Sequence, residues 1–143
     1  MVKYRKHLDD VHRIEVDKDK SNYKWRLDQS ERLIDFPKEF WDEFMGSITQ
    51  NDFITYPYVH QLKEKLAQHH NFNGTDNIFL VPGSDLAIRT MFDVFVTANS
   101  NVITTTPCFP MYEVYSKLYN TSFRQVPYDE DLTWSVDKLI NML

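Results

Sequence analysis

Hydrophobic positions divide the first half of the chain into a polar lead-in and two helical stripes. Residues 1–25 mix both charges densely without a sustained apolar period, which predicts a solvated arm. From Asp35 onward, apolar side chains recur every three or four residues, which predicts an amphipathic helix with Pro37 in its first turn. A second stripe begins at Val59 and predicts another helix that ends before Gly74.

The second half alternates strand candidates with helix candidates. The strand candidates are "NIFLV" (77–81), "NVITTT" (101–106) and "SFRQVPY" (122–128). Helical patterns follow them over 84–96, over 108–119 and from 135. Because parallel strands need long connections, this alternation predicts a mostly parallel sheet covered by helices. The fold class is α/β: an N-terminal arm and two helices, followed by the order β-α-β-α-β-α. We assign residues 1–34 to the arm and 35–143 to the α/β domain.

Composition and charge narrow the function classes. A hydrophobic share of 42% in 143 residues is enough for a core. With 16 basic against 21 acidic residues, no surface suited to phosphate backbones is expected, so we do not predict a nucleic-acid partner. No apolar stretch approaches the length of a membrane helix, and the first residues lack the apolar centre of a signal peptide; we therefore expect a cytoplasmic protein with no membrane partner. We do not predict a metal site: the single cysteine, Cys108, cannot assemble a thiolate site alone, and the consecutive residues His69 and His70 cannot both face one metal from a helix.

The junction after the first strand candidate carries the clearest candidate chemistry. Ser84 and Asp85 stand where a strand end becomes a helix N-terminus, so free backbone N–H groups and the positive end of the helix dipole meet there. Gly83 allows a ligand close to the backbone, and the Ser84 hydroxyl adds a hydrogen bond to phosphate oxygens. Ser and Asp are also preferred N-cap residues, and capping needs no ligand. The tripeptide by itself leaves both interpretations open.

The chain from "RLDQSER" to its end resembles the N-terminal part of the pyridoxal-phosphate aminotransferases, in the family of histidinol-phosphate aminotransferases. Three ordered features carry the resemblance: "YP" before a helix, "GSD" after a strand, and "PCFPMY" after the next strand. It implies part of the large domain of a fold-type I enzyme, with pyridoxal 5′-phosphate as cofactor and a homodimer as the assembly. The implied reaction moves an amino group between an amino acid and a 2-oxo acid or phosphorylated ketone.

The resemblance also implies roles for individual residues. Ser84 and Asp85, with Gly83, would hold the cofactor phosphate. The ring of Phe109 would stack on the cofactor's pyridine ring. Tyr56 would reach across the dimer interface to the partner subunit's cofactor phosphate. Without the resemblance, Phe109 would be interpreted as a core residue and Tyr56 as an ordinary packing aromatic.

The groups that would carry out amino transfer are not found in this sequence. The family uses a lysine that bonds to the cofactor aldehyde and an acid that pairs with the pyridine nitrogen, both later in the chain. Lys117 and Lys138 lie on predicted helices without the matching context, so no catalytic residue is assigned. In the family, later strands also separate 77–81 from 101–106. We therefore expect part of a longer enzyme or a truncated product, with an unpaired strand edge prone to association.

Two other functions stay open at this point. A decarboxylase on the same fold would share the cofactor-holding residues. A non-catalytic module would keep phosphate binding at residues 83–85, or would dimerise through the region of Tyr56. The segment "LDQSERLIDFP" keeps Glu31 but lacks the asparagines of the family's Asn-Glu-Asn-Pro segment, which leaves the substrate undecided.

Overall fold

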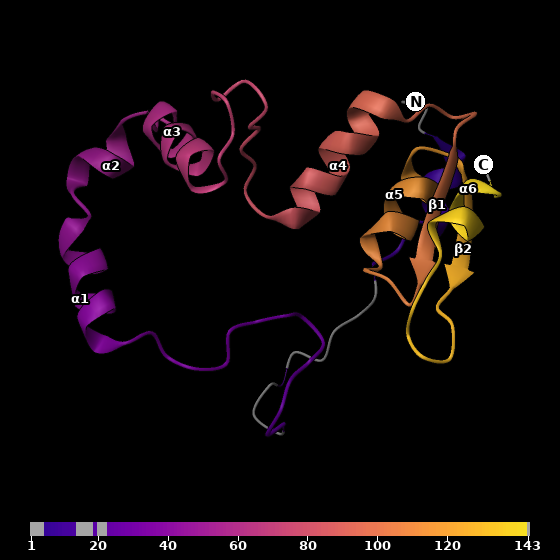
Figure 1. Ribbon diagram of the computed structural model, residues 1–143, viewed down its shortest axis with the longest axis horizontal. Helices are drawn as coiled ribbons and strands as arrows, with labels where there is room; N and C mark the ends of the chain where they lie inside the picture. Colours follow the sequence, from indigo (N-terminus) through magenta and orange to yellow (C-terminus); the bar gives the residue numbers. More distant parts are fainter. Residues whose placement is uncertain (1–4, 14–18, 20–22, 143) are drawn as a thin grey trace. The chain divides into compact units, whose positions relative to one another are not determined.

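The computed structural model describes residues 5–13, 19 and 23–142. The chain divides into two compact units. Unit 1 combines the residues up to Val16 with residues 81–143, and unit 2 is Asp17–Leu80. Figure 1 follows the chain through both units by colour.

Unit 1 contains a parallel strand pair joined by a helix. Strands β1 (Asn101–Thr106) and β2 (Ser122–Pro127) pair in parallel, with their first residues opposite each other and their last residues likewise. Figure 1 shows the two arrows side by side, pointing the same way, with α5 (Met111–Leu118) in the connection. This confirms the two later strand predictions and their parallel pairing.

The core of unit 1 lies between α5 and the preceding helix, α4 (Ser84–Phe95). Phe92 of α4 is 4% exposed, and its ring centroid lies 5.8 Å from that of Tyr115 on α5. Met111 completes this buried cluster, and Val102 of β1 packs against it. The helical apolar period therefore places one face of each helix in a shared core, where each large side chain contributes about 2 kcal/mol by leaving water.

Residues 5–13 belong to unit 1 and contact helix α5. A short 3-10 helix, η1 (Lys6–Asp10), contacts α5, and Nε2 of His7 donates a hydrogen bond of 3.2 Å to the carbonyl oxygen of Leu118. Leu8 and Val11 are half-buried. Most side chains of residues 5–13 are exposed, as expected for a solvated lead-in, but the segment also contacts α5, which charge density did not predict. The predicted arm also includes residues 1–4, 14–18 and 20–22, which lie outside the described residues. The boundary at residue 34 stays a prediction.

Unit 2 consists of three helices in the part of it that the structure describes. They are α1 (Lys38–Ser47), α2 (Gln50–Ile54) and α3 (His60–His69). The first and third confirm the two predicted helices. The short α2 was not predicted; a carboxylate oxygen of Asp52 accepts hydrogen bonds of 2.7 Å from both the backbone N–H and the hydroxyl of Thr49 at its start.

The strand predicted over 77–81 is not formed. Residues 77–80 instead line a hollow of about 250 Å³ beside the end of α3, with Leu66 and Phe72 among its other walls. Strands are stabilised by hydrogen bonds to a neighbouring strand, and among the described residues β1 and β2 pair only with each other. The described order after unit 2 is therefore α4-β1-α5-β2-α6, where α6 is Val136–Ile140.

Candidate functional site

The turn into α4 depends on a glycine. Gly83 has φ +87° and ψ 162°, a conformation that side chains bearing a Cβ rarely adopt. A Cβ built at this position would meet nothing within 4 Å, so backbone conformation rather than crowding demands glycine here. The chain consequently turns sharply into the helix and leaves open space beside Gly83.

The first turn of α4 has no side-chain cap. Gly83 is itself the N-cap residue, and Ser84 and Asp85 are the first two residues inside the helix. The first intrahelical bond runs from the N–H of Ala87 to the carbonyl oxygen of Gly83 at 3.2 Å. The simple capping interpretation of Ser84 and Asp85 is therefore not the arrangement found. The backbone N–H groups that begin the helix remain the natural donors for an anion at the positive end of its dipole.

The Asp85 carboxylate turns to other parts of unit 1. Its Oδ1 accepts a hydrogen bond of 2.8 Å from the Tyr115 hydroxyl, and its Oδ2 lies 3.1 Å from Nη2 of Arg13. Tyr115 is 8% exposed, and burial, followed by the hydrogen bond and charge of Asp85, raises its pKa above the usual value of 10.0. The sequence pointed to Asp85 but to neither partner, since they lie 30 and 72 residues away along the chain.

Phe109 lies between the end of β1 and the start of α5. It is 47% exposed, and its carbonyl oxygen accepts a hydrogen bond of 3.3 Å from the N–H of Tyr112 in the first turn of α5. The peptide bond before Pro107 is cis. Phe109 is therefore not a buried core residue, and its predicted role as a stacking surface for the cofactor stays a prediction. Through Tyr115, the helix that follows Phe109 is also the one that contacts Asp85.

Tyr56 lies in unit 2, between α2 and α3, and is 99% exposed. Full exposure excludes the ordinary packing role within unit 2, because the ring contacts almost nothing there. The predicted role across a dimer interface stays a prediction.

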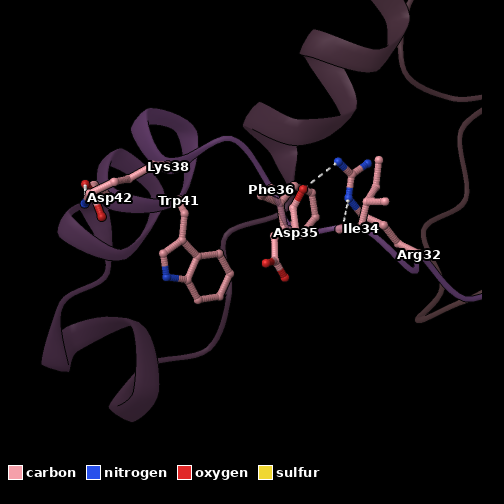
Figure 2. Close-up of a pocket in the computed structure, with 7 residues that line it drawn as sticks. All are labelled: Arg32, Ile34, Asp35, Phe36, Lys38, Trp41 and Asp42. Carbon is pink, nitrogen blue, oxygen red and sulfur yellow. Dashed lines mark hydrogen bonds and ion pairs between the residues drawn. The ribbon is translucent and has the colours of Figure 1, made fainter.

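A surface hollow in unit 2 was missed by sequence reasoning. Its volume is about 520 Å³, and Figure 2 shows the side chains around it. They are Arg32, Ile34, Asp35, Phe36, Lys38, Trp41 and Asp42. The Arg32 guanidinium lies 4.4 Å from the Phe36 ring centroid and donates to the carbonyl oxygens of residues 34 and 35 at 2.9 and 3.2 Å. Lys38 and Asp42 form an ion pair at 2.5 Å, as their spacing of four on a helix favours. The signal was the mixture of aromatic and charged residues in "RLIDFPKEFWD".

The described residues contain no helix long and apolar enough to cross a membrane. Within the same residues, no group of three or more His, Cys, Asp or Glu side chains could hold a metal ion.

The site described so far is a helix N-terminus entered through a glycine turn and followed by a parallel strand–helix–strand unit. Comparison of the sequence with known protein families identifies the class to which the chain belongs. The chain belongs to the class I and II aminotransferases, whose family model matches residues 25–142. This confirms the family resemblance.

Several curated histidinol-phosphate aminotransferases are similar to this chain. That of Clostridium novyi (strain NT) is 32% identical over 123 residues, which cover 85% of this chain and 34% of that protein. Those of Pyrococcus furiosus and Thermococcus gammatolerans are 29% and 30% identical over 114 residues, covering 78% of this chain and 33% of each relative. The chain therefore spans about a third of the length of these relatives.

Proposed function

We propose that this chain forms the cofactor-phosphate and ring-stacking part of a pyridoxal-phosphate-dependent aminotransferase. The observation that carries the proposal is the family match across residues 25–142, which includes a helix N-terminus entered through Gly83 at positive φ. The residues present suit the cofactor: the uncapped start of α4 offers backbone donors for a phosphate, and the open space beside Gly83 admits one.

Each residue of the proposed site has a distinct task. The N–H groups at the start of α4 and the hydroxyl of Ser84 bind the phosphate. Asp85 contributes through its backbone, because its carboxylate is engaged by Tyr115 and Arg13. Phe109 orients the pyridine ring by stacking against its face. When bound, pyridoxal phosphate withdraws electrons from the amino-bearing carbon of a substrate.

The proposal extends to assembly and substrates. Tyr56 is fully available to a second copy of the chain, which supports a homodimer in which each subunit completes the other's phosphate site. Because the relatives are named histidinol-phosphate aminotransferases, we propose a phosphorylated amino alcohol such as histidinol phosphate as the amino donor and a 2-oxo acid as the acceptor. Such small polar reactants fit a cytoplasmic enzyme.

A glycine substitution tests the phosphate site. Gly83→Ala forces a Cβ into a conformation that L residues disfavour, so we expect the turn to shift and the affinity for pyridoxine 5′-phosphate to fall about tenfold. This ligand lacks the aldehyde and cannot bond to surface lysines, so equilibrium dialysis reports the non-covalent site alone.

Gly74→Ala is the matched control. Gly74 also has positive φ, at +93°, and also has open space around it, but it lies in unit 2. Its substitution carries the same backbone strain and should leave the affinity unchanged. Equal losses in both variants, or a wild-type protein that does not bind pyridoxine 5′-phosphate, would refute the proposed site.

A further inference from the structure

A segment outside the family match reaches the proposed phosphate site. Arg13 precedes the matched residues, which begin at residue 25, yet its guanidinium contacts Asp85 in the first turn of α4. We propose that Arg13, held by residues 5–13 against α5, screens the Asp85 carboxylate with the help of Tyr115 and so strengthens phosphate binding at the start of α4. This inference rests on the proposed function and adds Arg13 and Tyr115 as positioning residues.

The segment has its own attachment to α5. In η1, the N–H of Leu8 bonds to the carbonyl oxygen of Arg5 at 3.0 Å, and the N–H of Val11 bonds to that of Leu8 at 3.1 Å. His7 donates to the carbonyl oxygen of Leu118 near the end of α5, at 3.2 Å. Arg13 follows two residues after Val11, so the segment runs from one end of α5 toward the Asp85 side chain that contacts the same helix.

The charge at Asp85 explains why screening is needed. A carboxylate in the first turn favours the helix itself but repels a phosphate that binds the same turn. Both of its oxygens have donors: the buried Tyr115 hydroxyl on Oδ1 and the Arg13 guanidinium on Oδ2. These bonds draw the negative charge toward α5 and the N-terminal segment.

Exposure sets the size of the effect. The Arg13 and Asp85 side chains are 68% and 39% exposed, so solvent weakens their interaction. We therefore expect Arg13→Gln to weaken binding of pyridoxine 5′-phosphate by about three- to tenfold rather than to abolish it.

The test compares two ligands that differ only in phosphate. Binding of pyridoxine 5′-phosphate and of pyridoxine to the full chain is measured by isothermal titration, at low and at high salt. Arg13→Gln should reduce affinity for the phosphorylated ligand alone, and the reduction should shrink at high salt. Arg13→Lys should restore most of the affinity. Arg5→Gln, which removes another exposed arginine of the same segment, should match the wild type.

Repeating the Arg13→Gln substitution in an Asp85→Asn variant separates screening of Asp85 from a direct contact between Arg13 and the phosphate. With Asp85→Asn in place, no charge remains to be screened, so Arg13→Gln should no longer weaken phosphate binding. An equal loss in both backgrounds would overturn the screening role, as would equal losses for both ligands, or no loss at all. The proposed function fails in a different way: the wild type would then bind the phosphorylated ligand no better than pyridoxine.

Discussion

Asp85 shows how a residue's position and its side chain can serve different purposes. The sequence placed it at a helix start, where a backbone N–H can serve an anion. The structure directs its carboxylate to Tyr115 and Arg13 instead. Helix position follows from neighbours in sequence, whereas the partners come from α5 and from the N-terminal segment, so only the former was open to prediction.

Tyr115 links this contact to alkaline stability. Its pKa is raised first by burial and then by Asp85, so the folded chain keeps a proton that the unfolded chain releases near pH 10.0. The stabilising contribution is present below that pH and is lost as pH rises through the folded pKa. In a background with Trp25→Phe and Trp41→Phe, which leaves Trp134 as the only tryptophan, we expect urea denaturation followed by fluorescence to show unit 1 weakening above pH 10.0.

Tyr115→Phe removes the ionisable group, so the variant should lose stability less steeply over the same pH range. Part of the dependence of stability on pH should remain in this variant, because the pKa of Tyr119 is also raised, first by its hydrogen bond to Asp93 and then by burial. Tyr112→Phe on the same helix is the control and should follow the wild type. A Tyr115→Phe profile parallel to the wild type would show that this group does not govern the alkaline limb.

At the scale of elements, helices α3 and α5 end in the same way. After α5, Asn120 has φ +55°, its N–H bonds to the carbonyl oxygen of Lys117 at 3.1 Å, and that of Thr121 bonds to Ser116 at 3.0 Å. After α3, Asn71 takes the same φ with the same pair of bonds. This is the Schellman termination, which favours glycine and accepts asparagine. Gly74, which we expected after α3, lies three residues beyond this termination.

Asn120→Gly should therefore stabilise unit 1, by up to about 1 kcal/mol, because glycine adopts positive φ without steric cost. Asn120→Ala should destabilise it by about 1 kcal/mol. Chemical denaturation measures both. Asn141→Gly is the matched control: Asn141 ends α6 with φ −68°, where glycine brings no relief, so the substitution should not stabilise. Stabilisation by both glycines would contradict this explanation, because glycine increases the entropy of the unfolded chain and should stabilise only where the folded backbone has positive φ.

At the scale of the whole molecule, burial differs sharply between the units. Among the described residues, four of the five buried hydrophobic side chains, Phe92, Met111, Tyr115 and Val126, belong to unit 1, whereas unit 2 buries only Ala67. The aromatic side chains of α1, including Trp41 at 46% exposed, lie on the surface of unit 2. Local stability follows buried apolar contact, so it should be concentrated in unit 1.

Hydrogen exchange measured by mass spectrometry should show this difference. We expect amides in β1 and α5 to exchange far more slowly than those in α1 and α3. Phe92→Ala should cost unit 1 about 3 to 5 kcal/mol and abolish much of its protection, while leaving exchange in unit 2 unchanged. Val94→Ala, on the same helix but 65% exposed, is the control and should change little. Similar protection in both units of the wild type would contradict the expectation.

The sequence by itself determined the elements whose stability is local and the family to which they belong. Helices α1, α3, α4 and α5 follow from apolar period, and the helix start at Gly83 follows from "GSD". The parallel pair β1–β2 follows from strand–helix–strand alternation, since a long connection allows only a few arrangements. Tertiary structure decided what depends on distant neighbours. Residues 77–81 need a partner strand and do not form a strand, η1 contacts α5 through His7, and Asp85 is held by Tyr115 and Arg13. Such contacts are set by which surfaces meet in three dimensions, and no periodicity along the chain records them.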